Sequence, residues 1–257
     1  MDVHILDSQY LGTSRRITVL RPRFRGRRAT PDRVSTLYLN DGQNLFEPER
    51  AFAGRTWRVA ETVNALTHDD RIPPMLIVGI DHGGERRARE YLPVADDRNP
   101  PGERPLGRHY VEFVTREVVP FIERTYGVSR RTSSRGFGGS SYAAVAALLA
   151  VLERPGVFGR LLLESPSLYV GARHMLRKAR RAPRWPARVY LGVGTTETGR
   201  PEIDRETVEN VRELESILRG RNLGPKRLKL VIRDGATHSE DAWAARLPAA
   251  LAFLFGS

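Results

Sequence analysis

The stretch GFGGSSYAAVAALLAVLERPGVFG, residues 136–159, places a glycine-rich run directly before two serines and an alanine-rich apolar segment. Alanine and leucine favour helix, whereas glycine lets neighbouring backbone approach closely. The stretch therefore predicts a strand that turns sharply into a helix, with Ser140 and Ser141 at the junction. A serine held at such a turn is one way of exposing a nucleophilic hydroxyl above a sheet.

Short apolar runs alternate with segments of helical period on both sides of this junction. Several runs are almost continuously apolar, as expected for central strands covered on both faces. The predicted strands are RITVLRP (16–22), STLYLN (35–40), MLIVGID (75–81), SSRGFGG (133–139), RLLLES (160–165), RVYLGVG (188–194) and LKLVIRD (228–234). The predicted helices span residues 57–67, 108–125, 142–153, 172–181, 204–221 and 240–254. This alternation predicts an α/β fold with a mostly parallel central sheet.

The chain length and one proline-rich segment set the expected organisation. A chain of 257 residues can bury one substantial core, so we expect a single domain over residues 1–257. Residues 92–107 hold four prolines in a polar context and predict a loop over one edge of the molecule. Ligands of such sheets sit beyond the carboxyl ends of the strands, where we expect the functional residues.

Composition and charge narrow the function classes. The absence of cysteine excludes disulfides, thiol catalysis and cysteine-ligated zinc. The start of the chain lacks an apolar secretory segment and no apolar run is long enough for a bilayer, which predicts a cytoplasmic protein with no membrane partner. The net charge of +12 raises the question of a polyanionic partner. Lysine occurs only at 178, 226 and 229, and arginine is spread widely, with dense segments at 15–33 and 173–184. This spread favours a compositional bias and disfavours nucleic acid, with a phosphate-binding footprint as the second interpretation.

The serine junction itself fits more than one interpretation. Residues 139–143, GSSYA, match the nucleophile-elbow pattern G-x-S-x-G except at the last position. In that interpretation Ser141 is the central serine, and the amide of Tyr142 at the helix N-terminus faces a developing oxyanion. The local motif fits equally an interpretation in which Ser140 or Ser141 only caps the helix. Phosphate loops do not fit, because Ser141 replaces the last glycine of G-x-G-x-x-G and no G-K-[ST] follows.

A serine nucleophile needs a base and an acid that orients the base, and in α/β-hydrolases the chain order is Ser, Asp or Glu, His. Glu197 follows the strand RVYLGVG, and His238 lies in the loop before the last predicted helix. Asp204 and Asp234 are competing acids. Of the six histidines, those at positions 4, 68, 82, 109 and 174 are interpreted as ordinary polar residues, although His82 is also placed to line a cleft. The histidines lack metal-ligand spacing, so we expect neither a metal nor a cofactor.

Taken together, the segments resemble the esterase family of α/β-hydrolases that contains enterochelin esterases, S-formylglutathione hydrolases, feruloyl esterases and mycolyltransferase relatives. The likeness is greatest to compact, single-domain bacterial members, and it implies the α/β-hydrolase fold with helices on both faces of the sheet. It covers almost the whole chain, and each segment alone is weakly specific. The segments that carry it are LGTSRRITVLRP, LYLNDGQNLF, LIVGIDHGGERRAREYLP, VVPFIERTYGV, GGSSYAAVAAL, VFGRLLLESPSLY, RVYLGVGTTETG and GATHSEDAWAARLPAALAFLF.

The resemblance implies a role for named positions. Ser141 corresponds to the family's nucleophile, His238 to its base and Glu197 to its acid, with Asp204 as the alternative acid. DGQNLF resembles the turn that supplies a second oxyanion-hole amide, so the resemblance adds Gly42 or Gln43 to Tyr142.

Two further features qualify this correspondence. Arg87, Glu90 and Tyr91 match an R-x-x-E-Y pattern and are expected to brace or line the pocket. Ala143 and Ala144 stand where the family usually has glycines. Their methyl groups put the close approach of strand and helix in question, because a shift of about an ångström at a nucleophile costs roughly a hundredfold in rate.

The sequence therefore predicts a serine carboxylic-ester hydrolase that acts on small-molecule esters through an acyl-enzyme intermediate. An acyltransferase with the same triad is one alternative. A non-catalytic scaffold that binds an anionic partner through its arginines is another, motivated by the two alanines and the net charge. The identity of the ester and the oligomeric state are left open.

Overall fold

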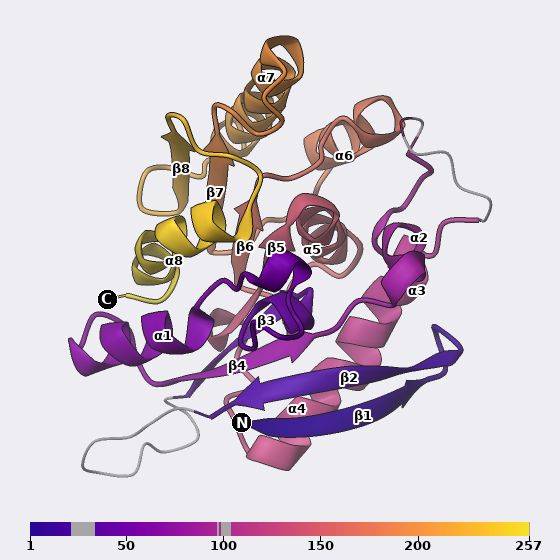
Figure 1. Ribbon diagram of the computed structural model, residues 1–257, viewed down its shortest axis with the longest axis vertical. Coiled ribbons are helices and arrows are strands. Elements are labelled where there is room, and N and C mark those ends of the chain that lie inside the picture. Colours follow the sequence, from indigo (N-terminus) through magenta and orange to yellow (C-terminus); the bar gives the residue numbers. More distant parts are fainter. Residues whose placement is uncertain (22–33, 97, 99–103, 257) are drawn as a thin grey trace.

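The computed structural model describes residues 1–21, 34–96, 98 and 104–256. Its strands form one eight-stranded sheet in the order β1-β2-β4-β3-β5-β6-β7-β8 (Figure 1). The strands are β1 (Asp2–Ser8), β2 (Thr13–Leu20), β3 (Ser35–Asn40), β4 (Met75–Ile80), β5 (Arg135–Ser140), β6 (Arg160–Glu164), β7 (Arg188–Gly194) and β8 (Leu228–Arg233). Every predicted strand is found, and β1 was not predicted.

The sheet is parallel from β4 through β3 to β8, and antiparallel where β2 pairs with β1 and with β4. Tyr38 of β3 lies opposite Val78 of β4 and Phe137 of β5. Because the six parallel strands point the same way, their carboxyl ends meet at one edge of the sheet. The mostly parallel α/β prediction is confirmed.

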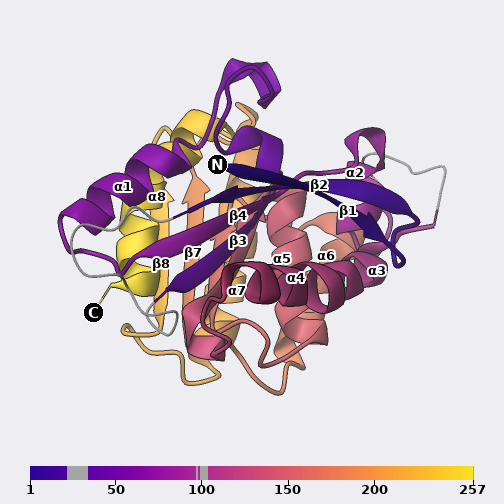
Figure 2. The ribbon, with the colours of Figure 1, turned by 90° about the horizontal axis from the view of Figure 1, so that it is seen from below.

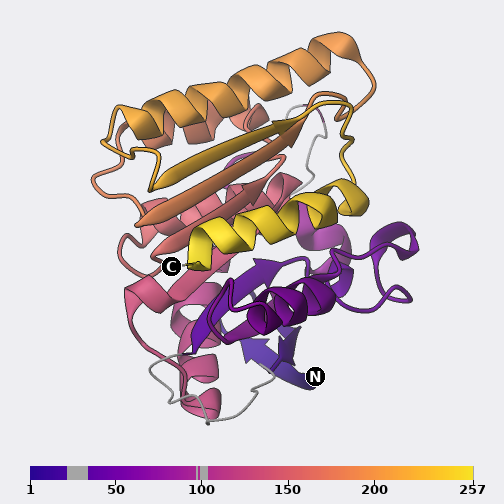
Figure 3. The same ribbon diagram turned by 90° about the vertical axis from the view of Figure 1, so that its left-hand side faces the viewer.

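Helices cover both faces of the sheet, as Figure 2 shows. The helices α1 (Val59–His68) and α8 (Glu240–Phe255) pack on one face. The other face carries α2 (Arg87–Tyr91), α3 (Gly107–Glu112), α4 (Val119–Tyr126), α5 (Ser141–Glu153), α6 (Val170–Arg180) and α7 (Pro201–Arg219). Figure 3 shows β7 and β8 lying between α7 and α8.

The core is divided by the sheet, because successive side chains of a strand point to opposite faces. In β3, Leu37 and Leu39 join the cluster under α1 and α8, whereas Tyr38 joins the larger cluster on the other face. Residues 143–151 of α5 are all buried, which explains why this helix is apolar on every side. The buried helix fixes the position of its first residue, Ser141, against the sheet.

The predicted helix 108–125 is interrupted in the structure. A wider π-helical segment, Phe113–Val118, separates α3 from α4. Pro120 stands in the first turn of α4 and has no N–H for a bond to the preceding turn, which accounts for a change of helix at this point. Four 3₁₀ turns complete the described elements: η2 (Gly42–Asn44), η3 (Phe52–Gly54), η4 (Gly84–Arg86) and η6 (Thr132–Ser134).

Parts of two predicted features fall outside the described residues, namely the arginine-dense segment from 22 to 33 and positions 97 and 99–103 of the proline-rich loop. Among the residues that the structure does describe, no helix combines the length and apolar character needed to cross a bilayer.

Candidate active site

Ser141 stands at a sharp turn between β5 and α5. Its φ is +56°, a left-handed conformation that is rare for a residue with a Cβ, whereas Ser140 before it is extended. Such strain persists only where the surrounding packing imposes it, and it clusters at functional sites. The turn therefore has the backbone geometry of a nucleophile elbow, and Ser141 lines a cleft.

The alanine at position 143 is accommodated by the glycine at position 139. A Cβ built on Gly139 would lie 2.8 Å from the Cβ of Ala143, so the methyl group of Ala143 occupies space that Gly139 leaves free. Both Ala143 and Ala144 are fully buried. The departure from the family pattern is thus absorbed by close packing of α5 on β5.

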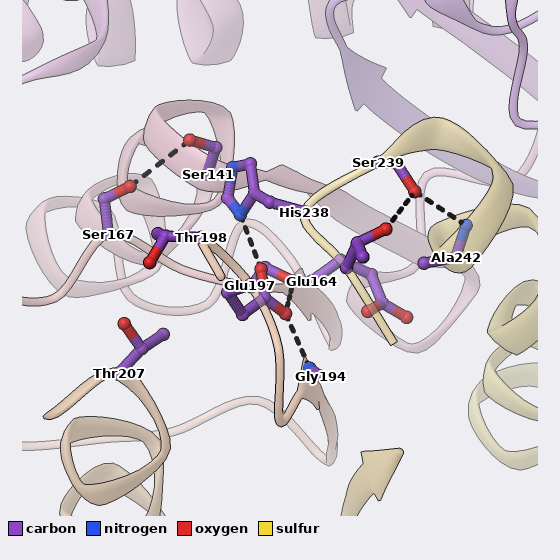
Figure 4. A network of polar contacts seen from close by, with 12 residues as sticks. Ser141, Glu164, Ser167, Gly194, Glu197, Thr198, Thr207, His238, Ser239 and Ala242 are labelled. Carbon is purple, nitrogen blue, oxygen red and sulfur yellow. Dashed lines mark hydrogen bonds and ion pairs between the residues drawn. The ribbon is translucent and has the colours of Figure 1, made fainter. Parts of the chain in front are cut away.

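His238 and Glu197 form a hydrogen-bonded pair. The Nδ1 of His238 lies 2.6 Å from Oε2 of Glu197, and Figure 4 shows the imidazole reaching from Glu197 toward Ser141. Glu197 follows β7 and His238 follows β8, so the pair sits at the carboxyl edge of the sheet. The indole of Trp243 meets the imidazole edge-on at 5.1 Å between ring centroids. This contact limits the orientations open to the ring.

The partners of Glu197 keep its carboxylate ionised and able to accept hydrogen bonds. Its Oε1 accepts hydrogen bonds from the Gly194 amide at 2.5 Å and from the Ser165 hydroxyl at 2.7 Å. Burial alone raises the pKa of Glu197, but these bonds and the His238 imidazole outweigh burial and leave the pKa below its ordinary value. An ionised carboxylate facing Nδ1 favours the tautomer that carries its proton there, which leaves Nε2 free to accept a proton.

Among the described residues, the hydroxyl of Ser141 is not hydrogen-bonded to the imidazole of His238. Its Oγ lies 3.3 Å from Oγ of Ser167, which follows β6 (Figure 4). Ser141 and His238 nevertheless line the same cleft. Catalytic hydrogen bonds are often loose before substrate binds, so the contact with Ser167 is compatible with a catalytic role of Ser141.

The competing acids lie elsewhere. Asp204 accepts hydrogen bonds from the amide of Thr198 at 2.6 Å and from its hydroxyl at 2.8 Å, which fixes the turn before α7. Asp234 accepts from the hydroxyl of Thr195 at 2.9 Å. Of the three carboxylates considered, Glu197 is the one that the structure brings to His238.

The turn with Gly42 and Gln43 follows β3 and packs tightly on β4. A Cβ at Gly42 would lie 2.7 Å from Oδ1 of Asp81 and 2.8 Å from the carbonyl carbon of Gly79, so only glycine fits. The side-chain oxygen of Gln43 accepts a hydrogen bond from the His82 amide at 3.1 Å. His82 thereby helps to fix this turn.

Asn40 connects that turn to the elbow. Its Nδ2 donates to the carbonyl oxygen of Ala143 at 2.9 Å, and its Oδ1 accepts from the Tyr110 hydroxyl at 2.7 Å. The end of β3 and the first turn of α5 are therefore held together by buried polar contacts. The two candidate sources of oxyanion-hole amides, Gly42 or Gln43 and Tyr142, belong to these two segments.

The R-x-x-E-Y residues brace this arrangement from α2. Arg87 donates to both carboxylate oxygens of Asp41 at 2.9 and 2.7 Å, and its guanidinium carbon lies 5.6 Å from the centre of the Tyr142 ring. The hydroxyl of Tyr91 accepts from the Asp41 amide at 3.2 Å. Glu90 is fully buried and pairs with Arg15 at 2.8 Å. Of the two expected roles, bracing is the one that the contacts show, and the three residues do not line the cleft.

The cleft beside Ser141 has a volume of about 660 Å³. Aromatic, hydroxyl and amide side chains line it together with a few charged ones. Its walls are formed by Asp96, Arg98, Ser141, Tyr142, Ser165, Pro166, Ser167, Leu168, Tyr169, Glu197, Thr198, Arg200, Ile203, Thr207, Asn210 and His238. Sequence reasoning missed most of these residues, although the segment Ser165–Ser167 directly follows β6, where the strand-end rule places ligands.

A buried polar network lies behind Glu197. Ser165, with a φ of +42°, accepts a hydrogen bond from Nε1 of Trp243 at 3.0 Å while donating to Glu197. Next to it, Glu164 of β6 pairs with Arg246 of α8 at 2.8 Å, and both side chains are almost fully buried. Burial raises the pKa of Glu164 to about 7, against the lowering effect of Arg246. Within the described ranges no three His, Cys, Asp or Glu side chains gather as a metal site would require.

Residues 8–254 match the family described as "Putative esterase". The chain belongs to this family. A curated relative, "Uncharacterized protein YbbA" of Bacillus subtilis, is 27% identical over 228 residues, which cover 86% of this chain and 85% of the relative.

Solved structures share the fold. The enterochelin esterase of Shigella flexneri superposes with a TM-score of 0.76 at 21% identity, over 98% of this chain and 57% of that longer protein. The siderophore hydrolase EstB of Aspergillus nidulans also reaches a TM-score of 0.76, at 19% identity, over 99% of this chain and 94% of EstB. The chain is thus an esterase-family member with the α/β-hydrolase fold.

Proposed function

We propose that the protein is a serine carboxylic-ester hydrolase in which Ser141, His238 and Glu197 form the catalytic triad. The observation that carries the proposal is the 2.6 Å contact between His238 and Glu197, in the cleft that the strained Ser141 also lines. A serine that only caps a helix does not require a nearby imidazole that is hydrogen-bonded to a buried carboxylate. The family supports an esterase activity on small molecules.

The proposed reaction uses each group once per half-reaction. The Oγ of Ser141 attacks the ester carbonyl while Nε2 of His238 takes its proton, and Glu197 stabilises the resulting imidazolium. The amides of Tyr142 and of Gly42 or Gln43 donate to the oxyanion. The alcohol leaves with the proton from His238, and water, activated by the same imidazole, then attacks the acyl-enzyme and releases the acid.

The test compares two serine variants with the natural protein in p-nitrophenyl acetate hydrolysis. We expect Ser141→Ala to abolish turnover. Ser140→Ala is the matched control, because Ser140 is adjacent and buried and its side chain makes no capping bond. Full activity of Ser141→Ala would reject the assignment. Product analysis with an added alcohol separates hydrolysis from acyl transfer by the same triad.

A further inference from the structure

One wall of the cleft is formed by a single face of α7. Ile203, Thr207 and Asn210 line the cleft, and their spacing of four and three residues places them in a row along the helix. Thr207 is seen on this side of the cleft in Figure 4. Tyr142 and Tyr169 contribute aromatic rings to the same cleft. A group attached to the ester carbonyl therefore meets α7 when it fills this space.

Asn210 is unusual among the polar residues of the cleft. It is only 4% exposed, and its side-chain amide forms no hydrogen bond with any residue that the structure describes. Packing does not seal this amide completely from solvent. Because Asn210 lines the cleft, its amide is reachable from there. By contrast, the hydroxyl of the neighbouring Thr207 has a partner, because it donates to the carbonyl oxygen of Ile203 at 2.8 Å.

Asp96, another buried polar residue of the cleft, is satisfied within the protein. Asp96 accepts hydrogen bonds from the hydroxyl groups of Tyr142 and Tyr169. Because the amide is open to the cleft, a ligand that displaces water from it has to replace the hydrogen bonds of that water, and a ligand that leaves the amide unpaired loses about 1–3 kcal/mol. A leucine at position 210 would extend the apolar stripe of Val211 and Leu214 at no such cost.

We propose that Asn210 is a specificity residue that selects esters carrying an amide, with its own donor and acceptor, over esters with a plain alkyl group. The proposal rests on the proposed function, because it places the amide in the cleft that contains Ser141. A carboxamide side chain offers both a donor and an acceptor, and another amide complements both. A site built for such bonds discriminates strongly against an analogue that cannot make them.

The test uses pairs of p-nitrophenyl esters that match in shape. N-acetylglycinate is compared with 4-methylpentanoate, and the series continues with two and three methylenes between the amide and the ester. A second series carries the acetamido group on the alcohol half. For each pair, the kcat/KM of the amide ester is divided by the kcat/KM of the alkyl ester. The ratio in the natural protein is then divided by the ratio in Asn210→Leu, so that the difference in chemical reactivity between the two esters cancels.

We expect this double ratio to be about tenfold or more for at least one pair, the size of one well-made hydrogen bond. Asn64→Leu, a half-buried asparagine on α1 across the sheet, is the control and is expected to give a double ratio near one. Double ratios near one for Asn210→Leu in both series would overturn the proposal. If Asn210→Leu does not fold, Asn210→Ala takes its place.

Binding separates this proposal from the assignment of Ser141. The same ester pairs are titrated calorimetrically into Ser141→Ala and into Ser141→Ala/Asn210→Leu, where no turnover through Ser141 is expected. Tighter binding of the amide ester that is lost in the double variant supports Asn210 even if Ser141 proves not to be the nucleophile. Equal binding of both esters to both proteins contradicts the role of Asn210 alone.

Discussion

Glu197 is held by the imidazole of His238, the amide of Gly194 and the hydroxyl of Ser165. The last two donate to Oε1, which leaves Oε2 for the imidazole. A carboxylate fixed in this way presents one ring nitrogen of His238 to the cleft. At the scale of single residues, the orientation of His238 therefore depends on the hydrogen bonds that hold Glu197.

The two candidate acids are separated by a pair of isosteric variants. We expect Glu197→Gln to lower kcat by about 10² to 10⁴, because an amide facing Nδ1 favours the wrong tautomer of His238. Asp204→Asn removes a charge but leaves that contact intact, so kcat is expected to change little. Steady-state kinetics with p-nitrophenyl acetate decide between them. A large loss in Asp204→Asn with normal kcat in Glu197→Gln would move the acid to Asp204.

Ser165 is predicted to be a positioning residue for Glu197. Removing its hydroxyl in Ser165→Ala should lower kcat by about tenfold with a smaller change in KM, since a hydrogen bond to a charged group is lost. Ser165→Gly also lacks the hydroxyl but suits the φ of +42°. Equal losses in both variants assign the effect to the hydroxyl. Recovery in the glycine variant would assign it to backbone strain instead.

The order of Ser141, Glu197 and His238 along the chain predicted that all three lie beyond the ends of strands in one parallel sheet, but it left Asp204 and Asp234 open as acids, and the contact between His238 and Glu197 is seen only in the fold. Ser167 and Asn210 were not predicted. Their presence in the cleft depends on how α7 and the segment after β6 pack, and no local pattern around either residue encodes that packing.

At the scale of elements, the distance between β5 and α5 is set by glycines. Gly139 faces Ala143, and Gly138 leaves room for Leu162 of β6, whose Cβ would lie 2.6 Å from an added methyl group. Side chains at these positions would push the helix or the neighbouring strand away. The position of Ser141 above the sheet depends on both contacts.

We therefore predict that Gly139→Ala lowers the free energy of unfolding by about 1–3 kcal/mol, the usual cost of overpacking. Ala143→Gly in the same chain should restore part of this loss, because the methyl contact at 2.8 Å disappears. Urea unfolding of the two single variants and the double variant measures the coupling. Strictly additive effects would show that the two positions do not compete for space.

The buried carboxyl group of Glu164, beside Arg246, gives the free energy of unfolding a pH dependence. In the unfolded chain Glu164 titrates near 4.5, whereas burial raises its pKa to about 7 in the folded protein. Its stabilising contribution is complete below pH 4.5 and is lost as the pH rises through 7. Relative to Glu164→Gln, the natural protein should become less stable across this window. Urea unfolding at several pH values tests this, and a constant difference between the two proteins would contradict the raised pKa.

The predicted strands include the edge strand β8, but the opposite edge strand, β1, was not predicted. β1 was missed because Val3 and Ile5 are exposed on an outer strand, so its pattern does not reflect burial. The predicted helix 108–125 has a continuous apolar face, and that periodicity does not reveal the wider π-helical segment inside it. Periodicity reports which side of an element is covered, but not how its backbone bonds are arranged.

At the scale of the whole molecule, the parallel strands bring the ends of β3, β5, β6, β7 and β8 to one edge, where the proposed triad and both candidate oxyanion segments lie. The net charge of +12, by contrast, comes from arginines spread along the whole chain. Many arginines are paired with carboxylates, including Arg87 with Asp41 and Arg246 with Glu164. The composition gives the net charge, whereas the fold shows which arginines are paired with carboxylates.

The central claim is that Ser141 is activated by His238, and covalent labelling tests it most directly. The protein is treated with a fluorophosphonate, which reacts with activated serines, and the adduct is located by peptide mass spectrometry. We predict one adduct, on Ser141, whose rate of formation falls sharply in His238→Ala. No adduct at Ser141, or labelling that is indifferent to His238, would contradict the account.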